Sequence, residues 1–472
     1  MRNSTALTIC SSDWCKAMLD IAFIFPGPGI SGGVNVILRH AMELLDKGAS
    51  ITMVSEGRVE PKQLAWHPIG DMLTHPNLVW CNFSEVAGRK FDVAIATWWM
   101  TYFDLARVDA RKYAYFVQSI ESRFYSLEQS EWRAAVDATY ELPVAFITEA
   151  KWIADYLRLM HSHSAYLVPN GIDRTIFRAA GAVISPRTPG RLRVLVEGPL
   201  EAPFKKVSDA IRLARDGGAH EIWLLTSSNV ADVEGVDRIF SQVPQEKTPE
   251  VYRSCDVLVK LSTVEGMFGP PLEMFCCGGT TIVYDVTGHD EYIAHGVNGL
   301  VAPMNDENRV QSLVKSLVQV PELLAKLKEG ALRTASQWPA WRESGDLFYE
   351  SLLSIRDKPN VERKALQTYS RTIWGFLRLH QQQRQTSDDQ RRELSDNLAS
   401  AHLKIRDLEH KSEELSNGYS EVSEAYGAST QLISSIYEST SWKLTRPIRL
   451  VGRLISDPSH VRKAIASRFS KS

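Results

Sequence analysis

Two carboxylates separated by seven residues are the first candidates for chemistry in this chain, and they are Glu265 and Glu273. Residues 256–262, just before the first carboxylate, form a short β-branched apolar run that ends in polar residues, which predicts a buried strand. The paired prolines that follow suit the first turn of a helix. We therefore expect Pro270 or Pro271 at the first helical position and Glu273 in the first turn.

A strand end followed by a helix start is where open α/β sheets bind their ligands. The N-terminus of such a helix presents backbone N–H groups and about half a positive charge to an anion. A carboxylate beside it can hold sugar hydroxyls, so Glu265 and Glu273 are candidates for ligand recognition. The alternative is that Glu273 caps the helix by accepting from a backbone N–H. The segment alone leaves both interpretations open.

A glycine-rich loop near the N-terminus, Gly27–Gly33, is the second candidate, because it follows a strand-like run and opens a helical pattern. It contains a G-x-G-x-x-G match, and Glu56 follows the next strand, where a ribose-binding acid belongs. An NAD(P)-dependent oxidoreductase is therefore a rival interpretation. Against it, Pro28 stiffens a turn that must approach a pyrophosphate closely, and the second half of the chain is left without a role. Gly32 and Gly33 would serve any diphosphate, because bare backbone can come close to it.

Strand-like and helical runs alternate through residues 19–178 and again through residues 192–355. This alternation predicts an α/β fold of two Rossmann-like, doubly wound domains with mostly parallel sheets, facing each other across a cleft. The segment 179–191 is rich in Pro, Gly and small residues and is the expected linker. A helical stretch from about 309 to 355 is expected to close the second domain, and residues 1–18 form an N-terminal extension.

A heptad pattern appears beyond about residue 375, where the composition becomes polar with few aromatic residues. It predicts a C-terminal coiled coil over residues 375–430, of about five heptads, which would set an oligomer or dock a partner enzyme. The alternative is an amphipathic helix docked on the rest of the chain. With Leu394 at position d, the residues that fall alternately on d and a are Leu394, Leu398, Ala401, Ile405, Leu408, Ser412, Leu415, Tyr419, Val422 and Tyr426.

The last segment, residues 441–472, carries eight basic residues and one acidic residue. A basic amphipathic helix of this kind is expected to contact a membrane surface that holds anionic lipid. A solvated tail is the alternative. At about 100° per residue, the apolar face consists of Leu444, Ile448, Val451 and Ile455, and the opposite face carries Arg446, Arg449 and Arg453.

The composition of the whole chain excludes several classes of protein. Its 472 residues suffice for two or three domains, and 54 basic against 56 acidic residues give no indication of a nucleic-acid partner. Six cysteines without metal spacing or a dense framework favour a reducing cytosol. There is no apolar run of about 18 residues and no secretory signal, so we expect a cytoplasmic protein, peripheral at the inner face of the membrane.

Several motifs, in their order and spacing, resemble one family. Over about residues 19–355 the chain resembles the retaining GT-B glycosyltransferases of group 1, also called family 4. The segments that carry the resemblance are Glu265–Glu273, similar to the E-x7-E signature; Gly32-Gly33-Val34, similar to the diphosphate loop; and Val168–Asp173 with Phe177, similar to the P-N-G-[IV]-D-x-x-x-F turn.

The resemblance implies transfer of a sugar from a nucleotide-sugar, bound mainly by the second domain, to a growing cell-surface glycan or lipid-linked acceptor. By position, Glu273 would hold the ribose hydroxyls and Glu265 would contact the donor sugar. Lys205 looks like the family's diphosphate-neutralising lysine, with Lys206 the near alternative. A lysine and a helix N-terminus can stabilise the charge that develops on the leaving diphosphate. No metal and no cofactor besides the donor substrate is expected, and the remaining predicted binding residues are Gly32, Gly33, Phe268 and Gly269.

The chain departs from the family pattern at three places. Glu197 stands where the arginine of a G-R-x motif is expected. The second glycine of the signature is shifted by one position, to Gly269. The family's histidine near the donor sugar is replaced by Gln118, which we take as the third catalytic candidate; a deoxyhexose donor without a 6-hydroxyl would explain the change. A non-catalytic GT-B scaffold of a glycan-assembly complex is the second alternative function.

Overall fold

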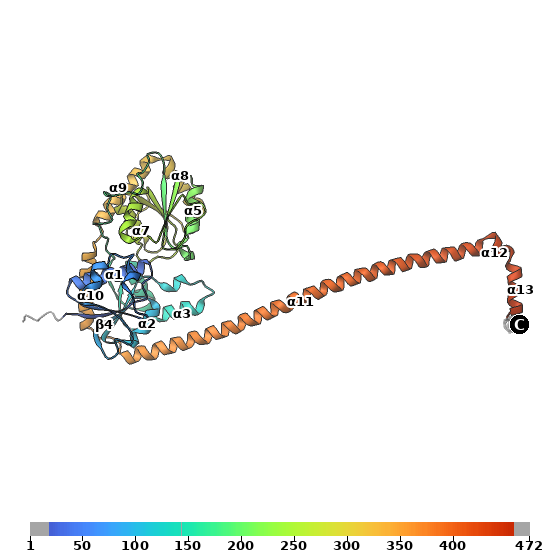
Figure 1. Cartoon of the computed structure of the whole chain (residues 1–472), viewed down its shortest axis with the longest axis horizontal. Coiled ribbons are helices and arrows are strands. Elements are labelled where there is room, and N and C mark those ends of the chain that lie inside the picture. The colour runs from blue at the N-terminus through green and yellow to red at the C-terminus, as the bar shows by residue number, and fades with distance from the viewer. Residues whose placement is uncertain (1–17, 143, 457–472) are drawn as a thin grey trace, which may run out of the picture. The chain divides into compact units, whose positions relative to one another are not determined.

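The computed structural model of the protein describes residues 18–142 and 144–456. The chain divides into two compact units after His380. The first unit holds two α/β domains, each built on a parallel sheet (Figure 1). The expected fold of two Rossmann-like domains with a C-terminal helical extension is confirmed. The N-terminal extension lies outside the described residues except for Met18.

The first sheet has seven parallel strands in the order β3-β2-β1-β4-β5-β6-β7. The strand order reverses between β1 and β4, where Ile21 pairs with Val93. Helices cover both faces, which is why the central strands are apolar throughout. The strands are β1 (Asp20–Ile24), β2 (Ser50–Ser55), β3 (Leu78–Asn82), β4 (Lys90–Ala96), β5 (Asp109–Val117), β6 (Ala145–Thr148) and β7 (Ala165–Leu167).

The helices on the first sheet come from both ends of the chain. Side chains of β1 alternate between the two core clusters, since Ile21 and Phe23 pack on one side and Ala22 and Ile24 on the other. One face is covered by α1 (Gly32–Asp46) and α10 (Trp341–Asp357), and the other by α2 (Trp99–Asp104), α3 (Ser130–Ala138) and α4 (Lys151–His161).

The second sheet has six parallel strands in the order β10-β9-β8-β11-β12-β13, with the reversal between β8 and β11. Its strands are β8 (Arg193–Glu197), β9 (Glu221–Thr226), β10 (Arg238–Ser241), β11 (Val257–Lys260), β12 (Thr280–Tyr284) and β13 (Leu300–Ala302). One face is covered by α5 (Val207–Asp216) and α8 (Glu307–Gln319), and the other by α6 (Thr248–Ser254), α7 (Gly269–Cys276) and α9 (Pro321–Gln337).

The chain passes between the two domains twice, at neighbouring places. Val168 is buried in the first domain and Ile172 in the second, so the first passage precedes the expected linker. The segment 179–191 is instead fixed to the second domain, where Arg187 donates to the carbonyls of Gly278 and Cys277 at 2.7 and 3.1 Å. The return passage runs beside the first one, because Ile172 N donates to Pro339 O at 3.0 Å.

Helix α10 does not close the second domain, as the sequence led us to expect for residues up to 355. Phe348 and Leu352 are fully buried in the core of the first domain, where Phe348 packs against Phe23 at a ring-centroid distance of 6.2 Å. The apolar period of a helix predicts that one face is buried, but it carries no information on which sheet that face covers. The first domain is therefore completed by residues that follow the second.

A single helix of 76 residues, α11 (Arg363–Glu438), follows. Its first turns belong to the first domain, where Leu366 and Leu377 are buried. The second unit contains the rest of α11, then α12 (Thr440–Leu444) and α13 (Arg446–Ser456). Residues 457–472 of the expected basic tail lie outside the described residues. Among the helices that the structure describes, none has the length and apolarity needed to cross a bilayer.

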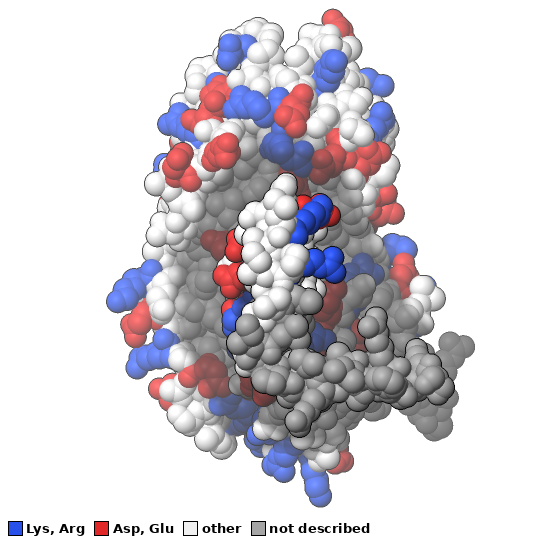
Figure 2. Space-filling model, turned by 90° about the vertical axis from the view of Figure 1, so that its right-hand side faces the viewer, with Lys and Arg blue, Asp and Glu red and all other residues white. Residues whose placement is uncertain are grey.

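The charges of the first unit are mixed. Figure 2 shows Lys and Arg interspersed with Asp and Glu over the coloured part of the face that it presents. This agrees with the near balance of 54 basic and 56 acidic residues. The visible face therefore offers no broad field of positive charge for a nucleic acid.

Candidate functional site

The candidate site lies at the carboxyl ends of β8 and β11, where the strand order of the second sheet reverses. Glu265 follows β11 in the loop before α7, and Lys205 ends the short 3₁₀ turn Pro203–Lys205 between β8 and α5. The Lys205 Nζ donates to both carboxylate oxygens of Glu265, at 2.8 and 2.9 Å. The fold thus brings together two of the three residues predicted to be catalytic, although 59 residues separate them in the chain.

Lys206, the alternative to Lys205, is directed elsewhere. Its backbone has φ +52°, in the left-handed region, and it stands at the N-cap of α5. Its Nζ pairs with Asp209 Oδ2 at 3.2 Å, within the same helix. Only Lys205 of the two neighbours contacts the signature carboxylate.

A second cation, Lys260, lies beneath this pair. Its side chain is 2% exposed, it donates to the carboxylate of Glu197, and its Nζ is 3.9 Å from Glu265 Oε1. Burial acts to raise the pKa of Glu265, but the ammonium groups of Lys205 and Lys260 outweigh it and hold that pKa below its usual value. Burial likewise lowers the pKa of Lys260, and the two carboxylates more than restore it. Glu265 is therefore ionised at neutral pH.

Lys260 pairs with Glu197, the residue that stands where the family pattern leads one to expect an arginine. Strands β8 and β11 are neighbours, with Val196 opposite Val259, so Glu197 and Lys260 are adjacent across the sheet. The positive charge absent from β8 is present on β11. Lys260 was not among the predicted site residues because it lies at the end of an apolar strand. The sequence pattern that could have indicated it is a lysine inside a run that must be buried, where an unpaired charge is costly.

Helix α7 begins at Gly269, which places Pro270 at the second helical position and Glu273 beyond the first turn. The position of Glu273 corrects the sequence-based expectation, and it also argues against Glu273 as a helix cap. Burial raises the pKa of Glu273 to about 7, against the opposing effects of Tyr252 and of nearby cations. The Phe268 side chain is fully buried in the second domain, and its carbonyl accepts from the hydroxyl of Tyr292.

Gln118 and the glycine loop meet on the first domain. Gln118 follows β5, and its Nε2 donates to Thr97 O at 3.1 Å. Its Oε1 is inaccessible to solvent and has no hydrogen-bond partner among the residues that the structure describes. A Cβ added to Gly33 would lie 3.3 Å from that Oε1. Gly32 opens the same helix, which Ser31 caps by accepting from Val34 N at 3.2 Å.

The first domain contacts the signature through backbone. A Cβ added to Gly266 would lie 1.8 Å from the Gln118 carbonyl oxygen, so only glycine fits this approach. Trp152 Nε1 donates to Gly266 O at 3.0 Å, and Ser119 Oγ donates to Glu265 O at 3.3 Å. The loop that carries Glu265 is therefore held from both domains.

Glu149 is a further residue of this contact that the sequence analysis missed. Its carboxylate accepts from Met267 N at 2.8 Å and from Asn170 Nδ2 at 2.7 Å. Burial raises its pKa to about 8. The sequence pattern that pointed to Glu265, a glutamate after a buried strand, is also present here, because Glu149 directly follows the buried strand β6. It orients the signature loop from the first domain.

The oxidoreductase interpretation finds little support in the geometry. Glu56, the ribose-binding acid of the oxidoreductase interpretation, forms an exposed ion pair with Arg107. Among the residues that the structure describes, no three His, Cys, Asp or Glu side chains are grouped to hold a metal ion. The arrangement instead places a partly exposed lysine against an ionised carboxylate.

Comparisons with known proteins agree with this geometry. Residues 228–334, which include Glu265 and Glu273, match the family model "Glycosyl transferases group 1". D-inositol 3-phosphate glycosyltransferase of Thermobispora bispora is 27% identical over 231 residues, which cover 43% of this chain and 53% of the relative. The O-antigen biosynthesis protein RfbC of Myxococcus xanthus is 25% identical over 285 residues, 57% of this chain and 21% of the relative. The chain thus spans between a fifth and about half of these relatives. The predicted resemblance to group 1 glycosyltransferases is confirmed.

Solved structures show the same fold. HepE of Anabaena in complex with UDP-glucose superposes with a TM-score of 0.57 at 15% identity, over 71% of this chain and 99% of HepE. Sucrose-phosphate synthase from Thermosynechococcus elongatus gives a TM-score of 0.57 at 14% identity, with coverages of 71% and 99%.

Proposed function

We propose that this chain is a retaining glycosyltransferase that moves a hexosyl or deoxyhexosyl group from a nucleoside-diphosphate sugar to a growing cell-surface glycan or a lipid-linked acceptor. The observation that carries the proposal is the Lys205–Glu265 pair, at 2.8 and 2.9 Å, beside the N-terminus of α7. A lysine in the loop that follows a strand, at the point where the strand order of a parallel sheet reverses, is a site for a diphosphate. An ionised carboxylate at the same point suits sugar hydroxyls.

Each residue then has a distinct task. The Lys205 ammonium turns from Glu265 to the diphosphate and neutralises the negative charge that grows as the bond from the sugar's anomeric carbon to the diphosphate oxygen breaks. Lys260, 3.9 Å from Glu265, stays behind and keeps that carboxylate ionised for the donor sugar. Glu273, with Gly269 at the start of the same helix, takes the nucleoside end of the donor. Retention of the anomeric configuration rests on the family resemblance.

The first domain supplies the other side of the donor. Gly33 and Gly32 leave room for the diphosphate at the start of α1, and the unpartnered Gln118 Oε1 is an acceptor for a sugar hydroxyl or amide. The proposal of a deoxyhexose donor rests on a different point, the absence of the family's histidine at this position, where Gln118 stands instead. HepE, with the same fold, binds UDP and UDP-glucose.

We also propose a cytoplasmic location at the inner face of the membrane, through α12 and α13. The exposed side chains of Ile448 and Val451 are apolar, and Arg449 packs its guanidinium 3.5 Å from the centre of the Trp442 ring. Tryptophan beside arginine is typical of segments that lie in a lipid interface. Deleting residues 441–472 should move the protein from vesicles containing anionic lipid to the unbound fraction in a flotation assay; unchanged flotation would reject this anchor.

The catalytic proposal is tested by donor binding and turnover in the full chain. A panel of nucleoside diphosphates and nucleotide-sugars should contain one that raises the melting temperature, and the matching sugar donor should be turned over. Lys205→Ala should lower kcat by about 10² to 10³-fold, by analogy with removal of a group that stabilises developing charge. The matched control, Lys206→Ala, should stay within a few-fold of the wild type.

The other functions give different results in the same assay. A scaffold would bind a donor without turnover in the wild type, and an oxidoreductase would be stabilised by a nicotinamide dinucleotide and not by a nucleoside diphosphate. Deoxy and 6-hydroxylated donors compared side by side test the role of Gln118. Clear preference for the 6-hydroxylated sugar would reject the deoxyhexose proposal.

A further inference from the structure

Among the residues of its own unit that the structure describes, none covers the apolar seam of α11. Leu415, Tyr419 and Val422 are 75%, 79% and 69% exposed. The same a/d register continues past the expected end of the coiled coil, with Ile433 at a and Ile436 at d, both exposed. A stripe of this length, about six heptads, is far more apolar surface than a solvated helix normally presents.

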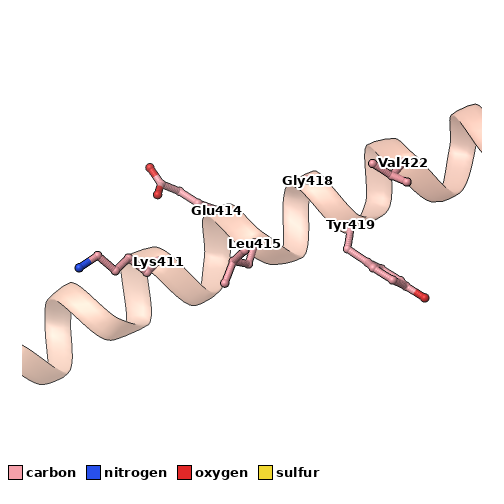
Figure 3. A pocket seen from close by; sticks show the side chains of 6 residues that line it. All are labelled: Lys411, Glu414, Leu415, Gly418, Tyr419 and Val422. Carbon is pink, nitrogen blue, oxygen red and sulfur yellow. The ribbon is translucent and has the colours of Figure 1, made fainter.

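A concavity lies on this seam. It is lined by Lys411, Glu414, Leu415, Gly418, Tyr419 and Val422, and Leu415 and Tyr419 leave the helix on the same side (Figure 3). Four of these residues, at relative positions i, i+3, i+4 and i+7, occupy d, g, a and d of the heptad. These four positions surround the hole that receives a side chain of a facing helix in a coiled coil. Gly418, at g, has no side chain and so widens the hole.

We propose that α11 pairs with α11 of a second copy of this chain, in parallel and in register, and that Tyr419 of each copy fills this hole in the other. In a parallel, in-register pair, position a faces position a, so the side chain that meets a hole centred on Tyr419 is the same tyrosine of the second copy. A widened hole fits a large aromatic ring. The side chain that fills the hole is therefore Tyr419 of the second copy, since Tyr419 also lies at the centre of the hole.

Two further features favour a second copy over another partner. Lys404 at g and Glu409 at e of the next heptad have opposite charges, and these positions approach each other between parallel helices in register. Ser412 is a polar residue at a, which meets its own equivalent only in register; a slip by one heptad places it against an apolar a residue, Ile405 or Tyr419. Ile405 at a and Leu408 at d are the combination that favours two-stranded parallel pairs.

The inference is independent of the catalytic proposal, because α11 beyond His380 contributes no residue to the candidate site. Parallel pairing would place two copies of α12 and α13 at the same end of the pair. Two weak basic helices on one particle bind a lipid surface more tightly than either alone, since the second contact is intramolecular.

Disulfide trapping in the full chain tests direction and register together. Leu408→Cys puts a thiol at d, and His410→Cys puts one at the outward position f as the matched control. Under mild oxidation, Leu408→Cys should give a covalent dimer, whereas His410→Cys and the wild type, with its native cysteines, should not. An antiparallel pair with full overlap of residues 394–436 would bring position 408 opposite position 422 and leave Leu408→Cys unlinked. That outcome would overturn the proposal.

Mass measurement in solution and a change at the hole complete the test. Light scattering should give twice the mass of one chain, and Tyr419→Ala should raise the dimer dissociation constant by at least tenfold without changing donor turnover at saturating protein. A monomer at micromolar concentration, or a dimer indifferent to Tyr419→Ala, would overturn the proposal. A mass that doubles only when another protein is added would assign the seam to that protein instead.

Discussion

Two glycines show how differently the two units of this chain are built. A Cβ at Gly266 would lie 1.8 Å from a backbone oxygen of the first domain, whereas a Cβ at Gly418 would have nothing within 4 Å. Around Gly266 the chain's own atoms fill the space and satisfy the buried charges. Around Gly418 the apolar side chains are exposed and the concavity is empty. The first unit is therefore organised by its own contacts, while the described part of the second leaves its apolar seam exposed.

The largest expected effect on stability and turnover comes from adding a side chain at Gly266. Gly266→Ala forces the signature loop and the Gln118 carbonyl apart, at a cost of about 3 kcal/mol or more for overpacking. Displacement of Glu265 by about 1 Å should also lower turnover by roughly 100-fold. Calorimetry and donor assays measure both. A variant with wild-type melting temperature and turnover would show that the two domains do not meet here in solution.

The next effect tests whether the first unit satisfies its own charges. Lys260→Met leaves Glu197 without its partner and should lower the free energy of unfolding by about 3 kcal/mol, the usual cost of removing one member of a buried pair. Adding Glu197→Gln should recover part of that loss. Urea unfolding measures each variant. Equal stabilities for the single and double variants would mean that the pair is not coupled.

A smaller effect concerns pH and Glu149. Its pKa is raised to about 8 in the folded chain, above the value near 4.5 of an unfolded one. The folded state therefore binds more protons than the unfolded state between these values, so this residue's contribution to stability is full below about pH 4.5 and is lost as the pH rises toward 8. The free energy of unfolding of the wild type should therefore fall between about pH 4.5 and 8, and Glu149→Gln should reduce that fall by roughly 2 to 4 kcal/mol. If the free energy of unfolding of wild type and variant changed with pH in the same way, the raised pKa of Glu149 would be contradicted.

The smallest expected effect comes from adding a side chain at Gly418, in the exposed seam of α11. Gly418→Ala adds about 1 kcal/mol of intrinsic helix stability to α11. The new methyl group also narrows the hole, so the variant should be more helical by circular dichroism while the dimer dissociation constant stays the same or rises. An Ala variant that is both more helical and more tightly paired would show that Gly418 does not make room for a side chain.

The sequence predicted the centre of each sheet better than its edges. Residues 256–262 were expected to form a buried strand, and β11, at the centre of the second sheet, lies inside this range. β3 and β10, at the edges of the two sheets, have mostly half-buried side chains and were not expected individually. Edge strands are paired on one side only, so their side chains carry a weaker pattern.

The candidate site was predicted residue by residue but not as a network. Glu265 and Lys205 were expected from the family resemblance, and the fold brings them into contact. Lys260 and Glu149 were not expected, because each acts on the loop from a strand or domain that only the tertiary structure brings near. A local sequence pattern indicates burial and helical or strand period. It does not indicate ion pairs among side chains from three separate segments, such as Lys205, Glu265 and Lys260.

The two neighbouring passages between the domains have a mechanical consequence. Ile172 is bridged to Ala340, and a Cβ at Gly171 would lie 2.3 Å from Trp341 N, so both connections cross at one line in direct backbone contact. Rotation about that line would keep the backbone contact between the passages, whereas sliding of one domain along the other would break it. Such a rotation would part Gly266 from the Gln118 carbonyl, the contact that leaves no room for a side chain at position 266.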